Sequence, residues 1–110
     1  MNYVSNVIEI NPLGGRVLEV GSRNINGSVR ELFADRARFP FYLGVDMLPG
    51  DGVDAIANSH RLGFIKDWFQ FLVSTEMLEH DDAFWLSLKE FYRVLAPNGL
   101  CILTTRGIGF

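Results

Sequence analysis

Residues 17–28 read Val17-Leu18-Glu19-Val20-Gly21-Ser22-Arg23-Asn24-Ile25-Asn26-Gly27-Ser28. The apolar, β-branched start predicts a buried strand, and the Gly, Ser and Asn residues predict a loop that leads into a helix. Proteins of the α/β class bind nucleotide-like cofactors with this arrangement of strand, backbone-lined loop and helix start. The carboxylate of Glu19 would repel a pyrophosphate and attract an ammonium group. The loop therefore suits a cofactor with a cationic end.

Strands and helices are expected to alternate along the rest of the chain. The hydrophobic pattern predicts strands at 16–20, 41–45, 53–56, 69–74 and 100–105, and helices at 28–37 and from 81 or 82 to 95. This alternation predicts an α/β, Rossmann-like sandwich of three layers, with a mostly parallel sheet between helices. Right-handed crossovers make 3-2-1-4-5 the expected strand order. A short helix or extended lead-in is expected at 3–10, a helical turn at 65–68 and a turn at 97–99.

Side-chain types predict how the helices are capped and packed. Asn26 or Ser28 is the expected cap of the first helix, and Asp81 or Asp82 that of the second. Helical spacing gives the second helix a predicted buried stripe of Phe84, Leu88, Phe91 and Leu95. The tryptophans and phenylalanines are expected in the core.

The composition indicates one globular domain, 1–110, with its core at 16–105. Of the 110 residues, 48% are hydrophobic, and the net charge of -3 argues against a nucleic-acid partner. The single Cys101 excludes an internal disulfide, and with two distant histidines it gives no metal-ligand spacing, so no metal is expected. Without a signal-peptide pattern or a long apolar run, we expect a soluble, cytoplasmic chain with no membrane partner.

Polar residues stand where the predicted strands end. Ligands of open α/β sheets bind beyond the carboxyl ends of the strands, where the strand order reverses, here between the first and fourth strands. Asp46 follows the second strand, and its carboxylate suits the two hydroxyls of a ribose, although an Asp also starts turns. Met47 either covers a flat heterocycle or fills a gap in the core. Asn58 and Ser59 follow the third strand and either contact a base edge or form a turn.

The loop after the first strand holds further candidates. Gly21 and Gly27 allow close approach of a ligand to the backbone, or a positive φ. Arg23 either clamps a ligand carboxylate or extends into solvent. His80 is the candidate general base near the inferred cleft, although a histidine at a helix start is more often a surface or capping residue. Polar loop residues either contact the ligand or stabilise the loop itself: Ser22, Asn24 and Asn26.

Five motifs follow one another in a known order. They read Val17-Leu18-Glu19-Val20-Gly21 with Asn26-Gly27-Ser28, Leu43-Gly44-Val45-Asp46, Asn58-Ser59-His60-Arg61-Leu62, Phe69-Gln70-Phe71-Leu72-Val73-Ser74-Thr75-Glu76-Met77-Leu78-Glu79-His80, and Arg93-Val94-Leu95-Ala96-Pro97-Asn98-Gly99-Leu100. Together they resemble class I S-adenosylmethionine-dependent methyltransferases, and most closely the type 11 methyltransferase domain. The resemblance covers about residues 16–105 and implies S-adenosylmethionine as the cofactor.

The resemblance implies a role for each matching position. Glu19 and Gly21 would line the methionine part of the cofactor, and the main chain at Ser74 or Thr75 would approach its amino group. The nucleoside part would contact a second group of residues, in which Asp46 holds the ribose, Met47 lies against adenine, Asn58 replaces the family's usual Asp, and Ser59 offers its backbone to the ring.

The chain departs from the family pattern at several points. Arg23 and Ile25 replace glycines, Gln70 replaces an Asp, and Asn98 replaces a glycine in the 97–99 turn. The antiparallel hairpin that usually follows the fifth strand is missing from the sequence. The fifth strand is therefore expected to be an apolar edge, and such an edge favours a homo-oligomer or a partner chain that completes the sheet. The edge and its continuation carry Cys101, Leu103, Ile108 and Phe110.

These observations predict S-adenosylmethionine-dependent methyl transfer to an unidentified small-molecule acceptor. The alternative is a non-catalytic methyltransferase-fold module that acts in cofactor binding or protein interaction. A dinucleotide-dependent oxidoreductase fits less well, because it needs a glycine where Arg23 stands and tolerates Glu19 poorly beside a pyrophosphate.

Overall fold

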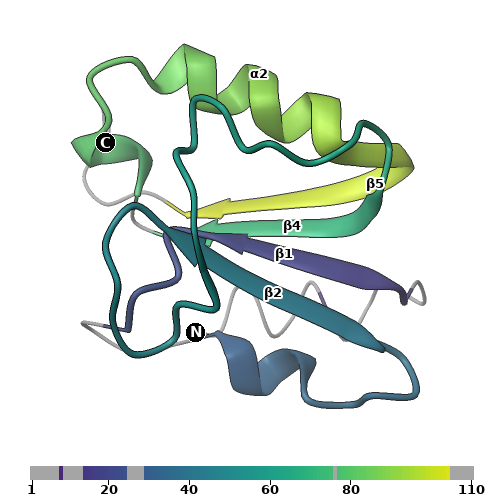
Figure 1. Cartoon of the computed structure of the whole chain (residues 1–110). Coiled ribbons are helices and arrows are strands. Elements are labelled where there is room, and N and C mark those ends of the chain that lie inside the picture. Colours follow the sequence, from purple (N-terminus) through teal and green to yellow (C-terminus); the bar gives the residue numbers. More distant parts are fainter. Residues whose placement is uncertain (1–7, 9–13, 25–28, 76, 105–110) are drawn as a thin grey trace.

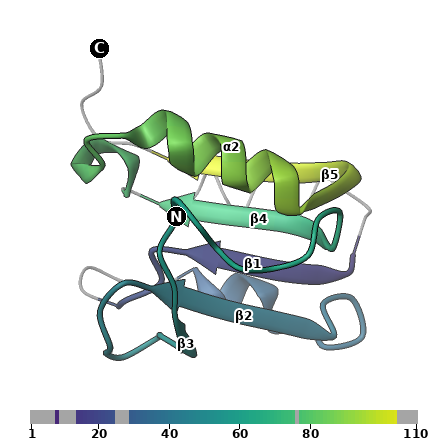
Figure 2. The ribbon, with the colours of Figure 1, turned by 45° about the horizontal axis from the view of Figure 1, so that its top comes forward.

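The computed structural model of the chain describes residues 8, 14–24, 29–75 and 77–104. Its sheet consists of β1 (Arg16–Val20), β2 (Phe41–Asp46), β3 (Ala55–Ile56), β4 (Phe69–Thr75) and β5 (Leu95–Thr104). All neighbouring strands are parallel, and their order is β3-β2-β1-β4-β5, as Figure 2 shows. The predicted fold class and strand order are confirmed. The carboxyl ends of all five strands therefore lie at one edge of the sheet.

Helical segments cover both faces of this sheet. The helix α2 (Phe84–Val94) lies on one face, and the 3-10 helix η1 (Arg30–Phe33) lies on the other (Figure 1). Side chains alternate between the faces along each strand. On β1, Val17 therefore packs in the cluster that contains Phe33 of η1, whereas Leu18 packs in the cluster that contains Phe91 of α2. Two apolar clusters, one on each face, make up the core.

The first predicted helix, 28–37, is wrong in length. The structure has only η1, followed by turns, because the Asp35 side chain offers the backbone an alternative to helix. Asp35 Oδ1 accepts from the Ala37 N–H at 3.0 Å, and the Asp35 carbonyl accepts from the Phe39 N–H at 2.7 Å. Phe39 is thereby turned into the core. The proposed caps Asn26 and Ser28 lie outside the described residues.

The buried face of the second helix also differs from the prediction. Phe91 of the predicted stripe is buried, together with Ser87 and Val94, whereas Phe84 and Leu88 are 48% and 36% exposed. Trp85, expected in the core, is 58% exposed. The α2 helix begins after Ala83 without a side-chain cap, so neither Asp81 nor Asp82 fills the N-cap position. Leu95, predicted to end the buried stripe, is the first residue of β5. The apolar side chains of α2 are spread over much of its circumference. Hydrophobic spacing alone therefore does not identify its inner face.

Several strand ends and turns are shifted. β2 and β4 each extend one residue beyond the prediction, and β3 has only two residues. β5 begins at Leu95 because residues 96–99 bulge out, so that Leu95 pairs with Phe69 and Leu100 with Phe71. In place of the predicted helical turn at 65–68, the chain makes a turn with Asp67 at φ 59°. Of the predicted 3–10 segment only Ile8, which is helical and buried, lies within the described residues.

The bulge in β5 provides a test of the backbone assignment. Asn98 has φ 64°, a left-handed conformation that costs most side chains about 1–2 kcal/mol and that Asn adopts more readily. Asn98→Ala should therefore lower the free energy of unfolding by about 1 kcal/mol in urea titrations. Asn98→Gly is the matched control and should remain within about 0.5 kcal/mol of the parent chain. Equal stabilities of the two variants would argue against this conformation.

Candidate functional site

A cavity of about 410 Å³ lies at the carboxyl edge of the sheet. Its walls come from the ends of β1 and β2, the loop after β3, and the segment between β4 and α2. This volume is within the range of small-molecule sites. Among the predicted site residues, the lining includes Gly21, Asp46, Met47, Asn58 and Ser59, together with His80. The topology therefore brings together candidates from four separate segments of the chain.

The turn after β1 requires Gly21. This residue has φ 79°, and a Cβ atom on it would lie 3.1 Å from the Met77 side chain. The N–H groups of Gly21 and Ser22 both donate to the Val45 carbonyl, at 2.9 and 3.0 Å. The loop is thus attached to the end of β2 and leaves backbone, without a side chain, at the cavity wall.

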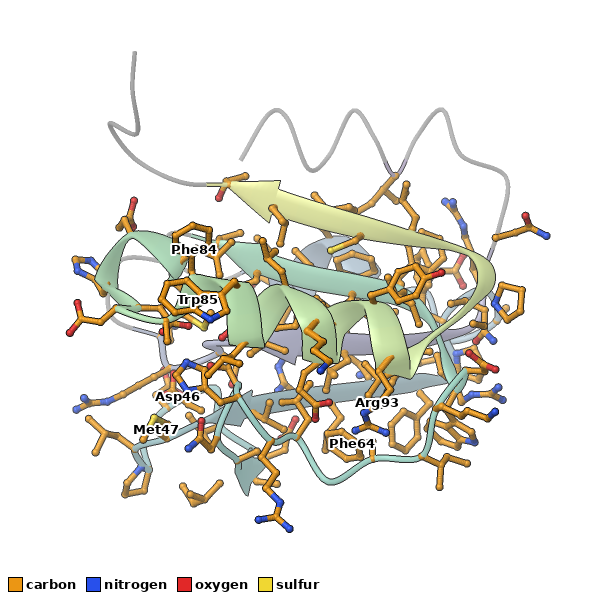
Figure 3. The ribbon with its side chains drawn as sticks, turned by 90° about the horizontal axis from the view of Figure 1, so that it is seen from above. Asp46, Met47, Phe64, Phe84, Trp85 and Arg93 are labelled. Carbon is orange, nitrogen blue, oxygen red and sulfur yellow. The ribbon has the colours of Figure 1, made fainter. Side chains whose placement is uncertain are left out.

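Asp46 and Met47 form the wall next to this loop. Asp46 Oδ2 accepts from the Arg23 N–H at 3.1 Å, and its Oδ1 accepts from the Leu48 N–H at 3.2 Å. The Met47 side chain is 62% exposed, which excludes the alternative that it fills a gap in the core. Figure 3 shows both side chains at the same end of the sheet.

The loop after β3 supplies an amide and a hydroxyl. Asn58 Oδ1 accepts from the His60 N–H at 2.9 Å, which forms a small turn. The Ser59 hydroxyl contacts the Ser87 hydroxyl at 2.8 Å. Since the side chain of Ser59 is engaged with α2, its main chain is the part that remains for a ligand. His80, on the 3-10 helix η2 (Leu78–His80), is a largely exposed lining residue that pairs with Glu79 at 3.8 Å.

Glu19 is buried on the opposite side of β1 and does not line the cavity. Its Oε1 accepts from the Tyr42 hydroxyl at 2.5 Å, and the guanidinium of Arg30 lies 4.8 Å from the centre of the Tyr42 ring. Burial raises the pKa of Glu19 to about 7, although Tyr42 and Arg30 favour the charged form. Burial and this carboxylate also raise the pKa of Tyr42, which therefore remains a hydrogen-bond donor.

Four other predicted residues lie outside the cavity wall. Ser22 and Ser74 are buried, and neither hydroxyl has a hydrogen-bond partner among the described residues. The Arg23 side chain is exposed, and Thr75 is half-buried at the end of β4. Gly27 lies outside the described residues.

Sequence reasoning did not single out several lining residues as ligand contacts, among them His60, Met77 and Asp81. Met77 packs directly beside Gly21, and Asp81 bonds to the ring of His60 at 2.8 Å. Asp81 was expected only as a helix cap, and no local pattern indicates a contact with a residue 21 positions away. Within the described ranges, no group of three or more His, Cys, Asp and Glu side chains is placed to hold a metal ion. No helix there is long and apolar enough to cross a membrane.

The sequence matches the family described as Methyltransferase domain over residues 18–103, which is most of the chain. The chain belongs to this methyltransferase family, and the resemblance of its motifs to the type 11 domain is confirmed. No curated protein sequence matches the chain.

Several solved structures share the fold. The YcgJ protein of Bacillus subtilis has a TM-score of 0.75 at 18% identity, covering 94% of this chain and 50% of that one. Phosphoethanolamine N-methyltransferase 2 of Haemonchus contortus, in complex with S-adenosyl-L-methionine, has a TM-score of 0.71 at 20% identity, covering 98% and 29%. The trans-methyltransferase CalH, in complex with SAH, has a TM-score of 0.67 at 18% identity, covering 92% and 34%. The chain thus spans half or less of the length of these three proteins.

Proposed function

We propose that the cavity binds S-adenosylmethionine and that the chain carries the cofactor site of an enzyme that methylates a small-molecule acceptor. The observation that carries this proposal is the convergence of Gly21 and Asp46 at the carboxyl edge of a methyltransferase-family sheet. The cofactor complexes of two proteins with this fold support it.

The donor and acceptor groups of the cavity suit the nucleoside part of this cofactor. A carboxylate has about four acceptor positions, and backbone N–H groups occupy only one on each oxygen of Asp46. The remaining positions would accept the two ribose hydroxyls. Met47 would cover a face of the adenine ring, while the amide of Asn58 and the main chain of Ser59 would meet its edge.

The methionine part would lie along the bare backbone at Gly21, where a side chain would collide with Met77. The main chain at Ser74 or Thr75 stays a predicted contributor to this end of the site, whereas the carboxylate of Glu19 is bonded to Tyr42 on the other side of β1. Bound S-adenosylmethionine supplies a methyl group that is already activated by the sulfonium. The main task of the protein is then to hold the acceptor in line with that methyl group.

Calorimetric titration of the purified chain with S-adenosylhomocysteine tests the proposal. We expect one-to-one binding with a dissociation constant in the micromolar range, on the order of -8 kcal/mol. Absence of binding by a folded sample would refute the proposed cofactor site. Binding without methyl transfer to any tested acceptor would favour the non-catalytic alternative.

The exposed edge of β5 is a further feature with a functional consequence. In the described sheet only β4 pairs with β5, so no described strand pairs with the other edge of β5. We propose that a second copy of the chain, or a partner chain, covers this edge. Light scattering at about 0.1 mM should then show a mass above that of the monomer, since edge strands favour pairing. A single monomeric species would contradict self-association and leave only the partner chain.

A further inference from the structure

Four polar side chains form a connected network at the cavity wall, from the loop after β3 to α2. Asp81 Oδ1 lies 2.8 Å from His60 Nε2, and its Oδ2 lies 2.5 Å from the Ser87 hydroxyl. Ser87 is fully buried and also contacts the Ser59 hydroxyl at 2.8 Å. His60, Asp81 and Ser59 all line the cavity. The network is therefore part of the wall that a bound ligand would contact.

The chemistry of these groups determines where the hydrogens lie. Burial opposes ionisation of Asp81, but hydrogen bonds from Ser87, His60 and the Ala83 N–H outweigh it and lower the pKa of Asp81. An ionised Asp81 only accepts, so Ser87 donates to it and must accept from Ser59. Nε2 of His60 likewise donates to Asp81. In the neutral ring Nδ1 is then the proton acceptor, and no described residue donates to it.

We propose that His60, oriented by Asp81, accepts the proton of the methyl acceptor during transfer. The proposal rests on the proposed function and adds a substrate class, namely neutral acceptors with an O–H or N–H nucleophile. Among the described residues of the wall, the remaining titratable side chains are Asp46, His80 and Asp82, and none is a lysine or an arginine. Near Asp81 and Asp82, this wall disfavours acceptors that carry a phosphate or carboxylate group.

The proton step balances with the transfer. A bond forms between the nucleophile and the methyl carbon, and the carbon–sulfur bond breaks with its electron pair on sulfur. The O–H or N–H proton passes to Nδ1 of His60. The resulting imidazolium is stabilised by the negative charge of Asp81, as in other Asp–His pairs. Asp81 acts here as a positioning residue.

Chemical modification of histidine tests whether this nitrogen faces the acceptor. Diethyl pyrocarbonate acylates unprotonated imidazole nitrogens, and the chain has two histidines that mass spectrometry separates. In the chain saturated with S-adenosylhomocysteine, we expect His60 to react at a rate within about threefold of its rate in the free chain, because neutral imidazole keeps its acceptor nitrogen. His80 is the internal reference. Nitrogen-15 spectra at about pH 7.5 should show the proton of His60 on Nε2. Asp81→Ala, which removes the acceptor of this proton, should abolish the fixed tautomer.

Each outcome decides between the two proposals. If S-adenosylhomocysteine does not bind, the proposed function fails, and this inference fails with it. If it binds and protects His60 more than about threefold, the imidazole belongs to the cofactor site, and the inference alone is overturned. A proton on Nδ1 would also overturn it. If Asp81→Ala does not fold, His60→Gln still assigns the resonances and leaves both measurements on the parent chain valid.

Discussion

Replacing Asp46 by alanine should weaken the binding of S-adenosylhomocysteine at least about tenfold while the chain stays folded. Each charge-assisted hydrogen bond to a carboxylate contributes about 1.5–3 kcal/mol, and tenfold in affinity corresponds to about 1.4 kcal/mol. Loss of two ribose contacts therefore exceeds this limit. The fold should survive because, among the described residues, the carboxylate is bonded to no group but the N–H groups of Arg23 and Leu48, in exposed loops. Calorimetry gives the affinity, and circular dichroism checks the fold.

Asp51→Ala is the matched control for this variant. Asp51 lies in the loop after β2, is exposed, and accepts from Asn24 Nδ2 at 3.3 Å, but it does not line the cavity. The Asp51→Ala variant should bind S-adenosylhomocysteine with the affinity of the parent chain. An equal loss of affinity in both variants would indicate a general disturbance of the loop, and an unchanged affinity of Asp46→Ala would remove this residue from the site.

The sheet and its functional edge were predictable because their signals are local. Strands buried on both faces give short apolar runs, such as 71–73, and their order follows from the handedness of the connections. Asp46 ends one run, and Asn58 and Ser59 follow another. Parallel strands place all of their carboxyl ends at one edge, so these three residues lie at the same cavity.

The helices were less predictable because their signals conflict. The inner face of α2 contains Ser87, whose hydroxyl can be buried only because Asp81 and Ser59 satisfy it. Apolar spacing ignores such a residue and favours Phe84 and Leu88, which are exposed. The hydrogen-bond partner of a buried hydroxyl can lie in another segment, so the hydrophobic periodicity of the helix does not indicate it.

The orientation of Glu19 illustrates a signal that was present but unused. Alternation along β1 puts Glu19 on the same face as Val17, toward η1, whereas Val20 and Gly21 reach the cavity. The carboxylate therefore bonds to Tyr42 from the neighbouring strand. A residue near the end of a strand can be adjacent in sequence to residues of the cavity wall while its own side chain faces the core.

The burial of Glu19 predicts that the free energy of unfolding falls as the pH rises. The Glu19→Gln variant should lack this fall. The pKa of Glu19 is about 7 in the folded chain, against 4.5 for an ordinary glutamate. Between these values the folded chain holds a proton that the unfolded chain has lost. Stability contributed by this proton is complete below about pH 4.5 and is lost as the pH rises through about 7.

The full effect is about 3 kcal/mol, because each pKa unit corresponds to about 1.4 kcal/mol. This is an upper value, because relaxation and water penetration lower the penalty of burying a charge. The amide introduced by Glu19→Gln would still accept from the Tyr42 hydroxyl, so the variant removes the charge and keeps the hydrogen bond. Other titrating groups remain in both chains and cancel in the difference between them.

Urea unfolding at a series of pH values from about 4.5 to 8 measures this difference directly. The parent chain should lose stability relative to Glu19→Gln across the series, and most of the loss should fall below about pH 7, where the folded chain still retains its proton. Glu31→Gln, at an exposed glutamate of η1, is the matched substitution for comparison. Parallel curves for the parent and Glu19→Gln would mean that Glu19 is as well solvated in the folded chain as in the unfolded one. Its burial against Tyr42 could then not be correct, because a carboxylate removed from water must hold its proton more tightly.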